Sequence, residues 1–236
     1  MQESISAPQV GGIVKLTGFI LKTSLIIEMI GAALLAPVFC NDLGIAKGLW
    51  YSLFHSISAF CNAGFDLFGI REPFSSLTFY HSNIYLNIII MMLIITGGIG
   101  FLVWGDIRIH KNRIRRFSLQ SKVVLMTSAV LIVLPALYFF FYEYDRETIH
   151  DRTIHSLFQS VTTRTAGFNT TDLAAMDESG TAIMIILMLI GGSPGSTAGG
   201  MKTATFAVLF LSAITVLRRR NDVQSRRPSG LRKTKP

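Results

Sequence analysis

The sequence predicts an all-α integral membrane protein made of two tandem units, each a helix, a short re-entrant helix, a loop and a second helix. Composition is the first observation behind this fold class. Half of the 236 residues are apolar and only 15% are charged, whereas an ordinary soluble protein carries about 25% charged residues. The second observation is a series of apolar stretches of membrane-spanning length, and the third is an internal repeat. This composition excludes a disordered chain, and its two cysteines exclude a disulfide-stapled scaffold.

The net charge of +8 comes from two basic segments. Residues 105–122 contain six Lys and Arg against one Asp, and residues 218–236 contain eight against one Asp. Each segment directly follows a long apolar stretch, which is the positive-inside pattern, so both are expected in the cytoplasm. A nucleic-acid interface would need a water-soluble domain to present it, and the sequence offers none.

Four long apolar windows occur along the chain, at 13–39, 83–104, 121–141 and 181–217. A membrane-spanning helix needs about 20 apolar residues, so each of the first three windows is expected to cross the bilayer once. With the basic linker in the cytoplasm, segments 40–82 and 142–180 lie outside. The N-terminal residues lack the pattern of a removable signal peptide.

The fourth window is too long for one helix. As a continuous helix it would measure about 55 Å, against a hydrocarbon core of about 30 Å. Its middle ten residues, here named the glycine-rich loop, contain five glycines and a proline and cannot remain regular helix. They are Gly191, Gly192, Ser193, Pro194, Gly195, Ser196, Thr197, Ala198, Gly199 and Gly200. Irregular backbone at membrane depth occurs where it is buried in protein or lines a water-filled path, so this loop is a candidate functional element.

Two other interpretations of the glycine-rich loop are weaker. A phosphate-binding loop requires Gly-Lys-Ser/Thr, whereas Met201 separates Gly200 from Lys202 in this chain. The spacing of the glycines also fits a close contact between membrane helices, but Pro194 favours an interrupted helix.

An internal repeat relates the two external segments, each of which contains a semi-apolar stretch too short to span the membrane. The matched blocks are Ser52–Ser58 (SLFHSIS) with Ser156–Thr162 (SLFQSVT), and Asn62–Asp66 (NAGFD) with Thr165–Asn169 (TAGFN). The offset is 104 residues for the first pair and 103 for the second. The chain therefore divides into a first unit at 1–104, a basic cytoplasmic linker at 105–116, a second unit at 117–217 and a basic cytoplasmic tail at 218–236.

The loop after each short helix has properties that suit a cation. A short helix that ends partway through the membrane directs its carbonyl end toward the interior, which favours positive charge there. The Ala-Gly pair that follows is small enough for backbone carbonyls to face an axis and replace a cation's hydration shell. An ordinary surface turn is the alternative for either copy, and its repetition at the same place in both units argues against that alternative.

Three segments, Phe54–Asp66, Arg164–Asn169 and Gly191–Thr203, resemble the Trk/Ktr/HKT superfamily of potassium transporters, closest to the KtrB-type bacterial membrane subunit. The resemblance implies four helix–pore–helix repeats around one ion pathway, and the two units look like the second and third. It implies potassium as the transported ion, with sodium coupling as an option, and neither a covalent cofactor nor enzymatic activity. It further implies a multi-pass protein of the bacterial plasma membrane that forms homodimers and binds a cytoplasmic nucleotide-sensing subunit of RCK type.

The resemblance also assigns roles to the loops. Each repeat of the family gives one loop to a potassium filter, and the glycine-rich loop of the third repeat gates the pathway from below. By motif, the filter backbone comprises Cys61, Asn62, Ala63, Gly64, Arg164, Thr165, Ala166 and Gly167. Counterparts of the first and fourth repeats are missing, and two loops alone cannot surround a dehydrated cation. The alternative function is a truncated fragment without transport of its own, which needs the missing repeats from another chain.

An intramembrane enzyme is not supported, because the spans contain no paired carboxylates and no nucleophile–base pair. His55 and His155 are expected to be satisfied structural residues rather than metal ligands, since each stands alone on a short helix. Cys40 and Cys61 are expected to be free thiols, because a disulfide between them would hinder the loop that contains Cys61.

Three charged residues lie near the expected pathway. Arg164 is expected to point away from it, toward an acidic side chain or a carbonyl. Lys202 follows the glycine-rich loop and is expected to act either as a barrier or as an anchor. Glu28 lies within a span, where an ionisable residue is either functional or the partner of a basic residue from another repeat.

Overall fold

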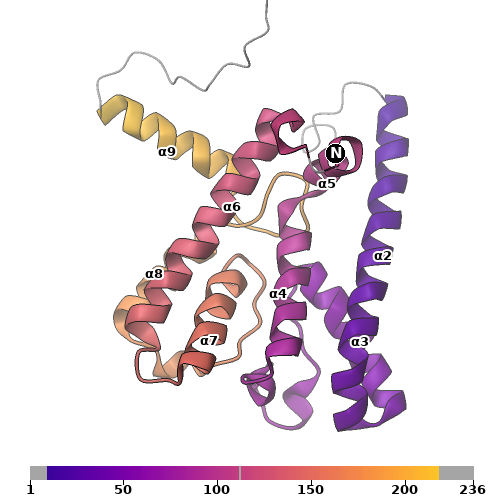
Figure 1. Ribbon diagram of the computed structural model, residues 1–236, viewed down its shortest axis with the longest axis vertical. Helices are drawn as coiled ribbons and strands as arrows, with labels where there is room; N and C mark the ends of the chain where they lie inside the picture. Colours follow the sequence, from indigo (N-terminus) through magenta and orange to yellow (C-terminus); the bar gives the residue numbers. More distant parts are fainter. Residues whose placement is uncertain (1–9, 112, 218–236) are drawn as a thin grey trace, which may run out of the picture.

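The computed structural model describes residues 10–111 and 113–217, and this part of the chain is helical throughout its regular structure (Figure 1). The α-helices are α2 (Val10–Leu43), α3 (Ile45–Phe60), α4 (Ile84–Ile99), α5 (Phe101–His110), α6 (Leu119–Tyr138), α7 (Ile149–Thr162), α8 (Glu178–Leu189) and α9 (Thr203–Leu217). A π-helical turn, η4 (Phe139–Glu143), extends α6, and short 3₁₀ turns are η1 (Phe68–Ile70), η2 (Thr78–Tyr80), η3 (Ile114–Arg116) and η5 (Leu173–Ala175). The basic tail expected at 218–236 lies outside the described residues.

Two continuous helical stretches are long and apolar enough to cross a membrane, Val14–Leu43 and Leu119–Glu143. The pair α4 and α5 would make a third span if the two helices count as one. In Figure 1, α2, α3 and α4 form one side of the molecule and α6, α7 and α8 the other, with α4 beside α7. The short helices α3 and α7 each pack against the long helix that precedes them.

The apolar window at 83–104 forms two helices rather than one, because the chain bends by 92° between α4 and α5. The bend is at Gly100, whose φ of 92° and ψ of 148° lie in a region open almost only to glycine. Two hydrogen bonds satisfy backbone groups around it: the indole of Trp104 donates to the Thr96 carbonyl at 3.1 Å, and the Phe101 amide donates to the Gly195 carbonyl at 2.9 Å. The bend is therefore built around a contact with the glycine-rich loop.

Local side-chain caps explain where the helices of the second unit begin. The hydroxyl of Ser118 accepts a hydrogen bond from the Ser121 amide at the start of α6, and that of Thr148 accepts one from the Asp151 amide at the start of α7. The Asp106 carboxylate on α5 also accepts hydrogen bonds from the hydroxyls of Ser118 and Ser121. This carboxylate ties the end of the first unit to the start of the second.

One apolar core is shared by both units. It contains the fully buried Phe39, Phe60 and Phe68 of the first unit, and Phe158 and Phe168 of the second. Because burial of large aromatic side chains dominates core packing, the two units form one body.

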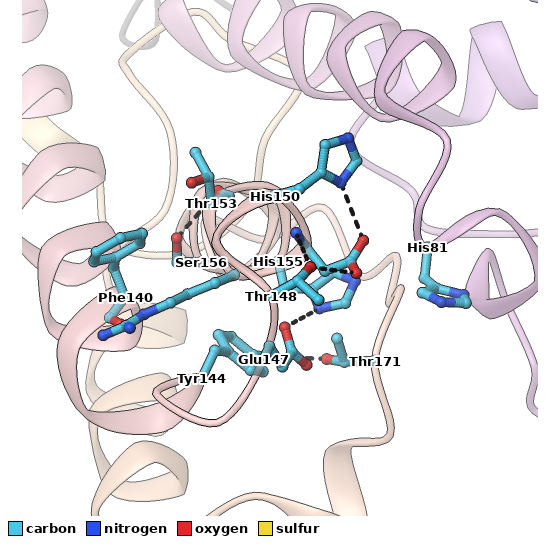
Figure 2. A network of polar contacts seen from close by, with 12 residues as sticks. His81, Phe140, Tyr144, Glu147, Thr148, His150, Thr153, His155, Ser156 and Thr171 are labelled. Carbon is cyan, nitrogen blue, oxygen red and sulfur yellow. Dashed lines mark hydrogen bonds and ion pairs between the residues drawn. The ribbon is translucent and has the colours of Figure 1, made fainter.

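A polar cluster at the start of α7 joins the two units (Figure 2). His155 is buried, its Nδ1 lies 2.6 Å from a carboxylate oxygen of Glu147, and its ring centroid lies 5.7 Å from that of His81 in the first unit. The hydroxyl of Tyr144 lies 3.1 Å from that of Thr171, and burial raises the pKa of Tyr144 to about 12. The cluster holds the N-terminal end of α7 against the first unit.

Candidate functional site

The two expected filter segments are in direct contact. The first loop (Cys61–Gly64) follows α3 and the second loop (Arg164–Gly167) follows α7. A Cβ atom placed on Gly64 would lie 2.4 Å from the Ala166 carbonyl oxygen and 2.8 Å from the Gly167 Cα, so the loops touch at a point that only glycine allows.

Both loops have the same unusual backbone. Asn62 and Gly64 have φ values of 51° and 71°, and their counterparts Thr165 and Gly167 have φ values of 66° and 88°. A left-handed conformation is costly for a β-branched residue such as Thr165, and such strain is typical of functional sites. Both loops therefore share a pattern of two left-handed residues separated by one residue, and this pattern is maintained despite its cost.

Equivalent hydrogen bonds hold each short helix in place. The Ser56 hydroxyl of α3 donates to the Glu28 carbonyl of α2 at 2.7 Å. The Ser160 hydroxyl of α7 donates to the Ile132 carbonyl of α6 at 2.6 Å. Ser160 and Ile132 lie 104 residues after Ser56 and Glu28, respectively, which is the offset of the internal repeat. The two units therefore position their loops in the same way.

The glycine-rich loop is hydrogen-bonded to both of these loops. The Thr197 hydroxyl donates to the Phe60 carbonyl at 2.7 Å, and it accepts a hydrogen bond from the side-chain amide (Nδ2) of Asn62 at 3.1 Å. The Gly199 amide donates to the Thr165 hydroxyl at 3.2 Å. This loop therefore contacts the first and the second loop at once.

The same loop also rests on the C-terminal end of α4. The Ser193 amide donates to the Gly98 carbonyl at 2.9 Å, and the Thr197 amide donates to the Gly97 carbonyl at 3.3 Å. Figure 1 shows the connection between α8 and α9 passing close to the junction of α4 and α5. The C-terminal end of α4 therefore supports the glycine-rich loop through the Gly97 and Gly98 carbonyls, and we call this contact the seat of the loop.

Backbone bonds close the glycine-rich loop on itself. The Gly191 amide donates to the Met201 carbonyl, and the Thr203 amide donates to the Gly192 carbonyl, both at 3.0 Å. The ammonium group of Lys202 donates to the Ala198 carbonyl at 2.8 Å. This bond holds the Lys202 side chain against the glycine-rich loop, and both roles expected for Lys202 stay predictions.

The predicted site residues differ in their exposure. In the first and second loops, Asn62, Arg164 and Ala166 are buried, Cys61, Gly64 and Thr165 are partly buried, and Ala63 and Gly167 are exposed. In the glycine-rich loop, Gly191, Gly192, Ser193 and Ala198 are buried, Pro194, Gly195, Ser196 and Thr197 are partly buried, and Gly199 and Gly200 are exposed. Exposed backbone therefore occurs where the first and second loops meet and at the end of the glycine-rich loop.

The prediction of the hydrogen-bond partner of Arg164 is wrong. Its guanidinium donates to the Ser128 hydroxyl on α6 at 3.1 Å, rather than to an acidic side chain or a carbonyl. Arg164 is 5% exposed, and its Nε has no partner among the described residues. The reason is local: Arg164 begins the second loop directly beneath α7, where α6 presents hydroxyl and apolar groups.

The isolated residues follow expectation in part. Cys40 and Cys61 are free thiols. His55 donates from Nδ1 to the Tyr51 carbonyl at 2.7 Å, but its Nε2 and that of His155 are buried without partners among the described residues, so neither ring is fully satisfied. Glu28 is partly buried, and the described residues include no ion-pair partner for it.

Sequence reasoning missed the seat on α4. Three glycines in four residues, Gly97, Gly98 and Gly100, close the second apolar window and were the available signal. Like the glycines of the fourth window, they indicate close backbone approach within a membrane helix.

Related proteins of known name are about twice as long as this chain. It is 40% identical over 216 residues to the potassium/sodium uptake protein NtpJ of Enterococcus hirae, which covers 89% of this chain and 47% of NtpJ. It is 37% identical over 228 residues to the Ktr system potassium uptake protein B of Bacillus subtilis, which covers 94% of this chain and 50% of that protein. The chain therefore spans about half the length of the curated relatives it matches.

The fold is also known. The chain resembles the crystal structure of the potassium transporter TrkH from Vibrio parahaemolyticus with a TM-score of 0.69 at 20% identity, over 90% of this chain and 43% of that one. The family model described as TrkH, cation transport protein, matches residues 2–230. The family model agrees with the predicted superfamily, which is a family of transporters and not of enzymes, and the structural likeness agrees with the fold of a multi-pass membrane protein. The chain belongs to the TrkH family of cation transport proteins.

Proposed function

We propose that this chain forms half of a potassium pathway, with the first and second loops as two of four filter loops and the glycine-rich loop as the gate. The contact of two loops with matching left-handed residues, above a loop hydrogen-bonded to both, carries this proposal. In this arrangement the units 1–104 and 117–217 act as the second and third repeats of a four-repeat pore.

The chemistry of the loops favours a monovalent cation. Backbone carbonyls are neutral oxygen ligands that can replace the hydration shell of potassium without binding it too tightly to leave. Each loop follows the carbonyl end of a short helix, which adds a favourable dipole. The names of the relatives include both potassium and sodium, so we propose potassium as the main ion and sodium as a competing or coupled one.

The glycine-rich loop would act by closing the path beneath the filter. Its bonds to Phe60, Thr165 and the end of α4 hold it in the arrangement described, and ion passage would require some of them to break. We further propose that a cytoplasmic nucleotide-binding subunit of RCK type biases this equilibrium.

Cation flux in proteoliposomes that contain only this chain tests whether copies of it transport without the missing repeats from another chain. An inward potassium gradient should drive potassium uptake, and this uptake should exceed the sodium uptake that an equal sodium gradient drives. Gly64→Ala should largely abolish potassium uptake, because the added Cβ atom clashes with the second loop. The control is Gly69→Ala, since a Cβ atom at Gly69 meets nothing within 4 Å. Absence of flux in correctly folded protein would leave the alternative, a part of a transporter that needs the missing repeats from another chain.

A further inference from the structure

Equivalent apolar residues of the two units differ sharply in burial. In the second unit, the residues buried in the shared core are Phe158, Val161, Ala166 and Phe168. Their counterparts in the first unit, Phe54, Ile57, Ala63 and Phe65, are exposed or partly exposed. The contrast is greatest at the aromatic residue after each Ala-Gly pair, where Phe65 is 69% exposed and Phe168 is 1% exposed.

The burial of Phe168 shows what such a residue packs against. Its ring centroid lies 6.4 Å from that of His55 on α3, within the core formed by the first unit. The loop of one unit therefore docks on the short helix of the unit before it. Phe65 would dock in the same way on a short helix equivalent to α7, but within residues 10–111 and 113–217 nothing covers it.

A matching cavity is lined mainly by the second unit, with Ala63 of the first loop also in its lining. Its volume is about 360 Å³, and its lining includes Gln159, which takes the position of His55, together with Phe168, Met184 and Met188. Gln159 is 1% exposed, and its Oε1 has no partner among the described residues. Met188 is 54% exposed, and methionine adapts readily to an incoming aromatic ring.

We propose that two copies of this chain assemble around one axis, with Phe65 of each copy inserted into the Gln159–Met188 cavity of the other. Resting on the proposed pathway, this assembly would complete the ring with four loops, two from each copy. The contact between copies would repeat the contact between the units within a copy, which the chain already forms. Because apolar surface gains little by leaving lipid, close packing of the ring in the cavity would supply the association and its specificity.

Photo-crosslinking tests the contact directly. The chain carries p-benzoylphenylalanine in place of Phe65 and is mixed, in nanodiscs, with isotopically labelled chain that lacks the probe. We expect crosslinks from position 65 to Met184 or Met188 of the labelled copy. The matched control places the probe at Phe74, which is 98% exposed and lies outside both docking surfaces.

A second measurement removes the ring. Phe65→Ala should weaken association of the copies by about tenfold or more, as for a central aromatic anchor, whereas Phe74→Ala should leave it unchanged. Both side chains are exposed in the single copy, so neither variant disturbs its core.

The outcomes separate this assembly from the function on which it rests. Crosslinks to the cavity together with cation flux support both, and crosslinks without flux support the assembly while refuting transport. A folded chain that stays monomeric, or that crosslinks from position 65 only to lipid or to other surfaces, overturns the assembly. Association that only an added chain with the first and fourth repeats can produce overturns it as well.

Discussion

Thr197 joins the glycine-rich loop to the first loop through both roles of its hydroxyl, as donor to the Phe60 carbonyl and acceptor from Asn62. Thr197→Val keeps the shape of the side chain but removes the 2.7 Å bond to the Phe60 carbonyl, which then keeps only the 3.3 Å bond from the Asn62 side-chain amide. It also removes the acceptor that Thr197 offers to that amide. We expect the free energy of unfolding to fall by about 1–3 kcal/mol, measured by reversible unfolding in mixed micelles.

The matched control for this change is Thr215→Val on α9, whose hydroxyl donates only to the Leu211 carbonyl of its own helix and is exposed. Its effect should stay within about 0.5 kcal/mol. Equal losses in the two variants would show that the Thr197 contacts add nothing to the stability of the loop.

For single residues, the sequence predicts which ones form the two loops better than it predicts their backbone conformation. The Ala-Gly pairs mark both loops, and glycine at positions 64 and 167 foretells left-handed backbone. The left-handed conformations of Asn62 and Thr165 could not be predicted, because they follow from tertiary contacts such as the bond from the Gly199 amide to Thr165. The partner of Arg164 was wrong for the same reason, since the sequence does not show which face of α6 lies beside it.

Among the helices, the junction of α4 and α5 depends on one residue. Gly100→Ala places a Cβ atom in a glycine-only backbone region and 2.8 Å from the Pro194 carbonyl oxygen. We expect a loss of about 1–3 kcal/mol and faster amide hydrogen exchange over residues 193–200, because the loop loses its seat.

Gly105→Ala is the control, because Gly105 lies within α5 and a Cβ atom there meets nothing within 4 Å. Alanine is the better helix former, so this variant should be neutral or slightly more stable. Unchanged exchange at 193–200 in the Gly100 variant would refute the dependence of the loop on the bend.

The N-terminus of α7 should respond to acid. Hydrogen bonds from Thr148, and then from His150 and Ser82, lower the pKa of Asp151 to about 2. A carboxyl group whose pKa is lower in the folded state stabilises the fold at higher pH, and this contribution disappears as the pH falls through the folded value. Asp151→Asn should therefore destabilise the protein near pH 5 and have little effect near pH 2.

Thermal unfolding at a series of pH values measures this difference, and Asp145→Asn, an exposed change in the preceding turn, is its control. A gap between the Asp151 variant and the parent chain that is constant over the whole range would contradict the assignment.

Helix positions were largely predictable and helix geometry was not. The long apolar windows foretell α2, α6 and the interruption between α8 and α9, because hydropathy and glycine content act locally. The 92° bend after α4 was missed, since it requires a partner loop almost 100 residues away to satisfy the freed backbone groups.

The two units behave as one body because Phe158 and Phe168 of the second complete the core of the first. The amide of Leu77 in the first unit also donates to the Asn169 carbonyl of the second at 3.0 Å. We therefore expect the units to stay together without the covalent link through the basic segment. A protease site placed in the linker between α5 and α6 should yield two fragments that remain associated in nanodiscs.

The strength of that association should depend on Phe168. Phe168→Ala opens a cavity in the shared core, and comparable changes cost about 3–5 kcal/mol, enough to release much of the second fragment in mild detergent. Phe74→Ala removes a ring of the same size from a 98% exposed site and should leave the fragments together. Co-purification of the untagged fragment with an affinity-tagged one measures the association in both variants. Separation of the unmodified fragments would mean that the linker, rather than the core, joins the units, and the docking of loop on short helix would then be too weak to recur between copies.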